Sequence, residues 1–257
     1  MKTTLSSFYK SLLAALLLFV SVAGWGQIMS WDGTTPTALT AYGPNPWTAT
    51  SISTGVVNST GITRGSSVLT APTAAGSAWG GSGGWEISET PSTNNGSVVF
   101  SLTVSSGYNL SLSSISSATR RSMSGPSTCV IQYSINSGSY VSLGTWTTTS
   151  TSGSTGTTNT TSLSSVTALQ GLAAGTIVNF RIVKFSSNTG SWYLIGSNAL
   201  KIDGTITPVP TCAAPTVSST VSVANNSTSG VDFSGSITNA GGGTNITERG
   251  FQYSTSV

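Results

Sequence analysis

The chain has 257 residues, of which only 6% are charged and 37% are hydrophobic, and its formal net charge is +3. Soluble domains average roughly 25% charged residues, whereas Ser and Thr supply about a third of this chain and Gly another 30 residues. This composition argues against charge-driven disorder and favours many short strands joined by turns.

A signal peptide is expected at residues 1–26. Lys2 and Lys10 precede an apolar run over residues 12–23. Gly24 and Gly26 occupy the −3 and −1 positions if cleavage falls before Gln27. A cut two or three residues earlier is the alternative. The apolar run is about a dozen residues long, short of the roughly twenty that span a membrane. We therefore expect a secreted or outer-cell-surface protein without a transmembrane segment after signal cleavage.

Residues 27–207 are predicted to form one all-β domain, because runs of strand length alternate with Gly, Asn and Pro turns. Residues 97–104 show the period of two that is typical of a half-buried strand. The apolar face of that strand comprises Val98, Phe100, Leu102 and Val104.

Further strands are predicted at residues 108–115, 128–135, 140–146, 176–185 and 200–206. A hairpin turn is expected at residues 136–138 and a single helical turn within residues 166–172. Residues 147–162 are nearly pure Thr, Ser, Gly and Asn, which predicts a loop or a solvated edge. The Gly-rich residues 79–85 are expected to be a loop.

The Pro-rich residues 208–215 predict a semi-rigid linker. Beyond the linker, three strands are predicted at residues 216–223, 230–238 and 247–254, with Asn225 and Asn226 in the first intervening turn. A fibronectin-type sandwich needs about seven strands. Residues 216–257 are therefore expected to be a partial module, and the chain a fragment of a longer multidomain protein.

Two stretches carry the motifs of a known architecture. Residues 98–135 include FSLTV, SGYNLSLSSI, RRS and IQYS, and residues 179–204 run from NFRI through WY to KIDG. They resemble the jelly-roll-like sandwich domain repeated in secreted and surface proteins of Gram-negative bacteria, over residues 28–207. Residues 232–237 and 246–254 resemble the front half of a fibronectin type III-like module. These resemblances imply an all-β protein, a jelly-roll-like β-sandwich followed by a partial immunoglobulin/fibronectin III-like sandwich, and they carry over no catalytic residue.

Catalytic residue types are scarce. Histidine is absent, which excludes Ser-His-Asp and Cys-His groups and most zinc sites, and only six acids are present. Glycoside hydrolysis needs two carboxyl groups about 5 to 9 Å apart, for which Glu86 with Glu89 or Asp32 is the pair to check. We expect no enzymatic activity in this chain.

Five residues are candidates for ligand contact. Trp47, Trp79 and Trp85 lie among Gly and Pro, where exposed rings would stack on sugars; the alternative is that they cap the core. Arg120 and Arg121 adjoin a Ser-Gly-Pro turn and would hold an acidic sugar or a carboxylate. Alternatively, these arginines brace main-chain carbonyls or pair with an acid.

Asp32 and Asp203 lie near the two ends of the first domain and are candidate ligands of a structural calcium ion, the one cofactor considered. Cys129 and Cys212 would form a disulfide in an exported protein. The alternative for Cys129 is a free thiol in the core.

These observations predict a non-catalytic β-sandwich module, expected to be monomeric, that binds an extracellular glycan or another cell-surface component, or serves as an adhesive or spacer module. The alternative is the accessory region of a larger secreted hydrolase or nuclease whose catalytic domain lies outside this chain. Basic residues cluster only at Arg120 and Arg121, so no nucleic-acid partner is expected.

Overall fold

The computed structural model describes residues 26–34, 42–57, 60–70, 78–152 and 156–210, together with the strand backbone of residues 216–217, 222–227, 230–234 and 237–239. The chain divides into two compact units, residues 1–208 and 209–257. The expected signal peptide lies outside the described residues except for Gly26, which already begins a strand. Within the described part, no helix is long and apolar enough to cross a membrane.

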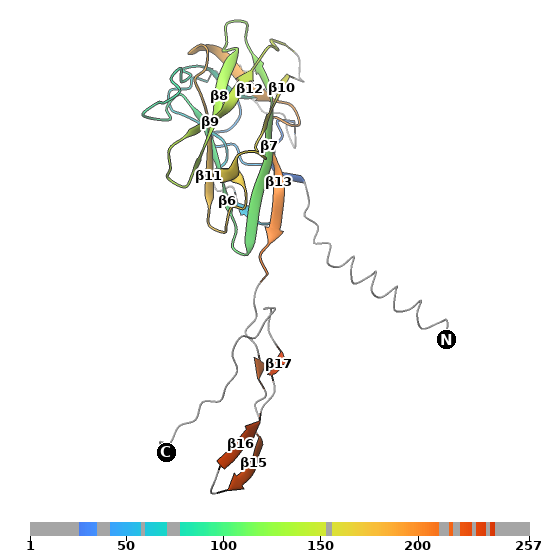
Figure 1. Cartoon of the computed structure of the whole chain (residues 1–257). Helices are drawn as coiled ribbons and strands as arrows, with labels where there is room; N and C mark the ends of the chain where they lie inside the picture. The colour runs from blue at the N-terminus through green and yellow to red at the C-terminus, as the bar shows by residue number, and fades with distance from the viewer. Residues whose placement is uncertain are drawn as a thin grey trace, which may run out of the picture. The chain divides into compact units, whose positions relative to one another are not determined.

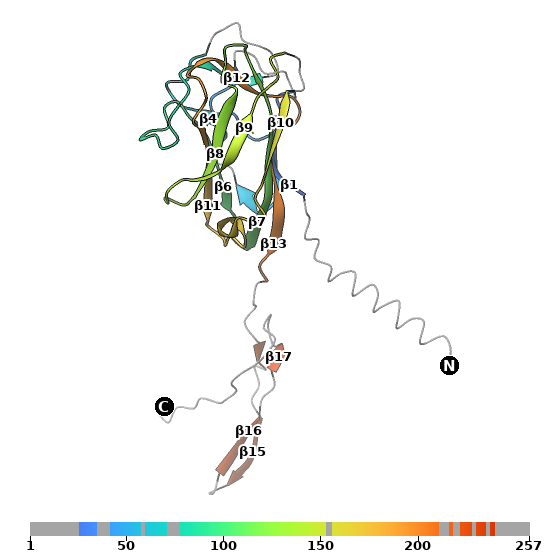
Figure 2. The same ribbon diagram turned by 45° about the horizontal axis from the view of Figure 1, so that its top comes forward.

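The first unit is a sandwich of two antiparallel sheets (Figures 1 and 2). The seven-stranded sheet has the order β2 (Ser51–Ile52), β1 (Gly26–Trp31), β13 (Leu200–Pro208), β7 (Tyr108–Arg121), β12 (Thr189–Ile195) and β5 (Ala78–Gly83), and β10 (Thr157–Ser162) also pairs with β7. The six-stranded sheet has the order β3 (Val56–Val57), β6 (Val98–Val104), β11 (Ile177–Val183), β8 (Thr128–Ile135) and β9 (Val141–Thr147), and β4 (Thr63–Arg64) also pairs with β6.

This architecture confirms the expected all-β sandwich. Most neighbours within each sheet are not consecutive along the chain, so the chain crosses repeatedly between the sheets, as in Greek-key and jelly-roll sandwiches. The strand expected at residues 128–135 is confirmed with the same bounds. The helical turn is a short 3₁₀ helix at Thr167–Leu169, and Asn136 takes a left-handed φ of 52° in the hairpin between β8 and β9.

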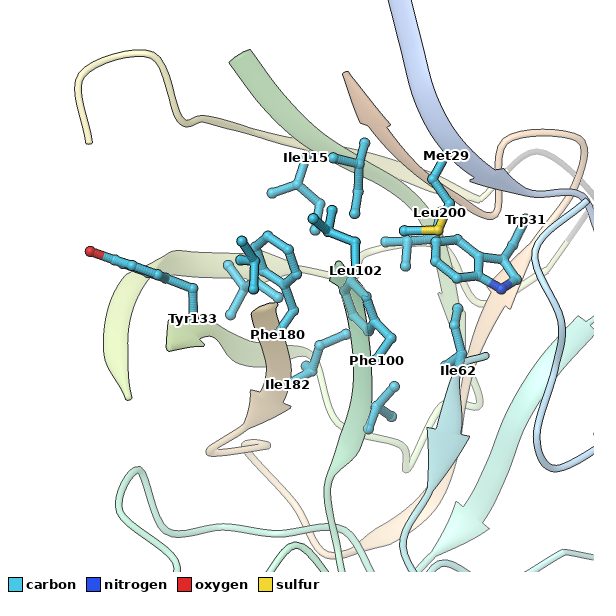
Figure 3. Packing of buried hydrophobic residues seen from close by; sticks show 14 of the residues in the cluster. Met29, Trp31, Ile62, Phe100, Leu102, Ile115, Tyr133, Phe180, Ile182 and Leu200 are labelled. Carbon is cyan, nitrogen blue, oxygen red and sulfur yellow. The ribbon is translucent and has the colours of Figure 1, made fainter. Parts of the chain in front are cut away.

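The core lies between the sheets and follows the predicted alternation. Along β6, buried and partly exposed residues alternate without exception, and the buried ones are the four apolar residues expected. Figure 3 shows Phe100 among side chains from both sheets. Its ring meets Trp31 edge-on at 5.7 Å and stacks on Phe180 at 5.2 Å. Each such buried side chain contributes roughly 1.5–3 kcal/mol through loss of apolar surface to water.

The Gly-rich residues 79–85 were expected to be a loop, and this was wrong. Most of them form β5, which pairs with β12. At Gly80, a Cβ atom would collide with the main-chain carbonyl of Trp192, and at Gly81 it would collide with Val68. Glycine is therefore needed for the close approach of neighbouring backbone, even though its low strand propensity argues against a strand.

Two further boundaries differ from expectation. β7 is 14 residues long and continues six residues past the predicted end, because its far half pairs with β10 and β12. β10 is built from the polar stretch predicted to be a loop or a solvated edge. Its residues alternate between partly exposed and exposed, so pairing with β7, rather than apolar burial of its own side chains, orders it.

The second unit contains two short antiparallel pairs. β14 (Thr216–Val217) pairs with β17 (Ile237–Asn239), and β15 (Ser222–Ser227) pairs with β16 (Gly230–Ser234). Asn225 and Asn226 lie inside β15 rather than in a turn, at a point where the pairing register shifts. The strand expected at residues 247–254 lies outside the described residues.

Candidate ligand-binding cleft

The three tryptophans proposed to stack on sugars are buried. Trp79 is 0% exposed, Trp85 2% and Trp47 5%. The indole N–H of Trp79 donates to the Pro44 carbonyl at 2.7 Å, and Trp47 stacks on Trp79 at 6.0 Å between ring centroids. The indole N–H of Trp85 likewise donates to the Gly190 carbonyl at 2.9 Å. All three rings belong to the core and present no face to a sugar. Burial supports the alternative, in which they cap the core.

The two adjacent arginines do not share a site. Arg121 donates to the main-chain carbonyls of Thr148, Met123 and Gly125 at 3.0, 2.7 and 3.1 Å. These bonds brace the turn that follows β7, which is the alternative to anion binding. The Arg120 guanidinium lies 5.1 Å from the centre of the Tyr193 ring. Because neighbouring strand residues point to opposite faces, the two guanidinium groups diverge.

The two aspartates considered for calcium lie far apart. Asp203 pairs with Gln27 near the start of β1, whereas Asp32 directly follows the last residue of β1. Five residues of extended strand separate these points by about 16 Å, so one ion cannot contact both carboxylates. Asp203 forms an ion pair with Lys201 at 2.9 Å. Among the described residues, no three His, Cys, Asp or Glu side chains are grouped as a metal site would need.

Cys129 is a free cysteine, fully buried at 0% exposure, and Cys212 lies outside the described residues. Burial raises the pKa of the Cys129 thiol far above its ordinary value. The raised pKa keeps the thiol protonated, whereas the thiolate is the reactive form. The structure thus places Cys129 in the core as a free thiol, which is the alternative to the disulfide.

We expect Cys129 to be unreactive toward a thiol reagent in the folded protein. In a Cys212→Ser variant, a chromogenic disulfide reagent at pH 8 should label no thiol natively and one thiol per chain in denaturant. Fast labelling of the folded variant would contradict the burial of Cys129. Absence of a free thiol in the denatured, unreduced wild-type chain would instead show that the two cysteines are paired.

The two glutamates considered as a hydrolytic pair are both held by local partners. Glu86 accepts a hydrogen bond from the main-chain N–H of Ser88 at 2.8 Å. Glu89 forms an ion pair with Lys184 at 2.6 Å and accepts from the Ser142 hydroxyl at 2.7 Å. The hydrogen bond from Lys184 has the largest effect and that from Ser142 the next largest, and both lower the pKa of Glu89. A general acid at neutral pH needs a raised pKa, so Glu89 is tuned away from that role.

A cleft of about 320 Å³ lies on the outer face of the six-stranded sheet. It combines residues from β4, β6 and β11 with residues from three loops. The polar lining residues are Thr60, Thr63, Asn94, Ser101, Tyr140 and Asn179. Phe100 and Phe180 also line it, and because their rings point into the core, it is their main chain that meets the cleft.

Strand register places polar residues in rows across this face. Asn179 on β11 lies between Ser101 on β6 and Ser134 on β8. In the next row, Arg181 lies opposite Gln132 of β8. Outward residues on a sheet are normally exposed, yet Gln132 and Ser134 are each only 3% exposed and Arg181 is 7% exposed. The outer face is therefore covered here by other parts of the chain.

The loop before β6 supplies part of this cover. The Gln132 amide donates to the Glu89 carbonyl at 3.1 Å and to the Ser142 hydroxyl at 3.2 Å. Together with the bonds that Glu89 makes to Lys184 and Ser142, these contacts hold the loop against β8 and β9. Hydrogen bonds and an ion pair thus help to hold this loop, which supplies Asn94 to the cleft.

Arg181 lies at the centre of the covered region. Its Nε donates to the Gln132 side-chain oxygen at 2.7 Å, and its guanidinium carbon lies 3.8 Å from the centre of the Tyr140 ring. Its two terminal nitrogens have longer contacts of 3.5 Å, to the Asn94 side-chain oxygen and the Glu89 carbonyl. Burial lowers the pKa of Arg181, but a guanidinium stays protonated in proteins.

A second hollow of about 350 Å³ lies at the end of the seven-stranded sheet where β1 begins and β13 ends. Its lining includes Gly26 and Pro208, which adjoin segments outside the described residues. Gln27 and Tyr108 are its large polar side chains. The cleft over the six-stranded sheet has six polar lining residues against four here. Two of those six, Asn94 and Tyr140, contact the buried Arg181, so that cleft is the better candidate.

Comparison with protein-family models finds no match for this chain, and a search of curated proteins finds none either. The assignment of the site therefore depends on its geometry. None of the residues singled out from the sequence for ligand contact lines this cleft. One signal could have found it: Asn179 and Arg181 occupy alternate positions in a strand that is otherwise almost wholly apolar.

Proposed function

We propose that this chain is a non-catalytic binding module that recognises a glycan in the cleft on the outer face of the six-stranded sheet. The proposal is carried by the lining itself, in which hydroxyls, carboxamides and the apolar Val99 surround one aromatic side chain, Tyr140. Sugars present many hydroxyls, each of which both donates and accepts hydrogen bonds. Carboxamides and hydroxyls match that pattern because they also do both.

Binding rather than turnover is supported by the acids beside the cleft. Glu89 is held ionised by Lys184, and Glu86 accepts a main-chain hydrogen bond. The nearby ionisable groups thus serve to hold the loop in place. With export through the signal peptide expected at residues 1–26, the ligand would be an extracellular or cell-surface glycan.

A blocking variant tests the location of the site. Ser101 points outward from β6 into the cleft and is partly exposed. Ser101→Tyr should fill the cleft and weaken binding to an immobilised glycan by at least about tenfold, since lost contacts of ~1.4 kcal/mol already give that factor. Affinity would be measured by calorimetry on a glycan first selected from an array by the wild-type chain.

The matched control is Ser116→Tyr. Ser116 is a partly exposed residue of β7 between Lys201 and Thr160, on the seven-stranded sheet. This variant should bind as the wild type does. Equal losses in both variants would place the site elsewhere, and a wild-type chain that retains no glycan would reject the proposal in favour of a spacer role.

A further inference from the structure

The stacked pair of Tyr140 and Arg181 is the feature of the cleft that says most about its ligand. Tyr140 follows the hairpin turn before β9, while Arg181 belongs to β11, so the contact joins a loop to the sheet. A separation of 3.8 Å between the guanidinium carbon and the ring centre is the distance of close parallel packing. One face of the ring is thereby occupied, and the rest of Tyr140 lines the cleft.

The guanidinium is itself immobilised. Its Nε bond to Gln132 is 2.7 Å long, and the Gln132 amide is in turn bonded to the Glu89 carbonyl and the Ser142 hydroxyl. Arg181 also reaches Asn94, a second lining residue, at 3.5 Å. Two lining side chains from separate loops thus contact one buried cation. Arg181 orients both while remaining outside the lining.

The charge around the cleft is balanced. No lining residue is charged. Lys184 and Glu89 neutralise each other at 2.6 Å, and Glu86 acts on Arg181 as a nearby negative charge. A carboxylated or sulfated sugar would therefore find no exposed cation in the lining to compensate for its desolvation. A neutral sugar needs no such compensation.

We propose that the cleft binds a neutral pyranose glycan, with one sugar ring packed on Tyr140 and with Arg181 as the positioning residue that holds Tyr140 in place. This inference rests on the proposed function and adds the class of sugar and the residue that receives it. A volume of about 320 Å³ is at the lower end of the range for small-molecule sites, so a short segment of the glycan enters.

The test combines two polysaccharide panels with four variants of the full chain. Neutral glucan, mannan and xylan are compared with acidic polygalacturonate and alginate, and binding is measured by affinity electrophoresis and calorimetry. Tyr140→Ala should weaken binding to the retained neutral polymer about tenfold, and Tyr140→Phe, which keeps the ring, by no more than about threefold. Arg181→Lys, which keeps the charge but not the planar group, should weaken it about fivefold.

The double variant Tyr140→Ala with Arg181→Lys separates positioning from direct contact. If Arg181 acts through Tyr140, the double variant should bind about as weakly as Tyr140→Ala alone, whereas independent effects would multiply to about fiftyfold. A merely structural role would lower the unfolding temperature without this non-additivity in affinity. Unfolding temperatures of all variants are therefore measured in parallel.

The outcomes distinguish the two proposals. Three results would overturn this inference and leave glycan binding intact. The first is that the chain retains only acidic polymers, and the second is that the effects of Tyr140→Ala and Arg181→Lys on affinity multiply. The third result is a Tyr140→Ala variant that binds as the wild type does, while Ser101→Tyr still weakens binding. Failure of the wild-type chain to bind any polymer would overturn both. Thr160→Ala on β10, in the other sheet, serves as the unchanged control.

Discussion

Gly80→Ala should destabilise the sandwich by about 4 kcal/mol or more, which is at the upper limit of ordinary single substitutions. The added methyl group would meet the main-chain carbonyl of Trp192 across the β5–β12 pair. Backbone cannot rotate away as a side chain can, so the strands must separate. Thermal unfolding followed by circular dichroism should show a midpoint lower by roughly 10 °C or more for a unit of this size.

Gly107→Ala is the matched control for this experiment. Gly107 has a left-handed φ of 80°, and a Cβ there would meet nothing within 4 Å. This change should cost only the backbone strain of a non-glycine residue, about 1–2 kcal/mol. A Gly80→Ala protein as stable as Gly107→Ala would show that β5 is not packed against β12 as the structure has it.

Arg64→Met should cost about 3 kcal/mol or more in the free energy of unfolding. The guanidinium of Arg64 donates to the carbonyl oxygens of Tyr42 at 2.6 Å and Gly80 at 2.8 Å, and also to that of Gly43. It also lies 5.2 Å from the centre of the Trp79 ring. Methionine fills similar space but leaves three acceptors without this donor, each at a cost of roughly 1–3 kcal/mol when buried.

Urea unfolding monitored by tryptophan fluorescence would measure this loss. Arg64→Lys should lie between the wild type and Arg64→Met, because an ammonium group keeps the charge but cannot span the same carbonyls as a planar fork. Lys201→Met removes another cation, whose partner is the Asp203 carboxylate at 2.9 Å, and should cost about 1 kcal/mol or less. Similar losses for Arg64→Met and Lys201→Met would refute the importance of the carbonyl contacts.

The strands that depend on local alternation could be predicted from the sequence. In β6 and β8, apolar side chains recur at every second position, and burial against the opposite sheet enforces that pattern. The fold class followed from these strands and from the abundance of turns. β5 could not be found in this way, because its glycines are selected by the nearness of Trp192 and Val68, which the local sequence does not reveal.

The cleft could not be predicted because its parts come together only through strand register. Asn94, Tyr140 and Asn179 are separated by tens of residues and belong to two loops and a strand. Conversely, Trp79 and Trp85 looked exposed because glycines surround them, but those glycines let backbone pack closely around the rings. An arginine in an apolar strand was the informative residue, since burying a cation requires specific partners.

The small size of the cleft has a consequence for how strongly such a module could hold a surface. If the cleft binds a glycan as proposed, a hollow of about 320 Å³ would contact only a short stretch of polymer, and a single copy would dissociate readily. A polysaccharide repeats its unit many times, however, so a copy that dissociates would rebind a neighbouring unit while other tethered copies remain bound. Avidity can then exceed the individual affinity by roughly 10²–10⁴, and attachment would depend on the density of copies.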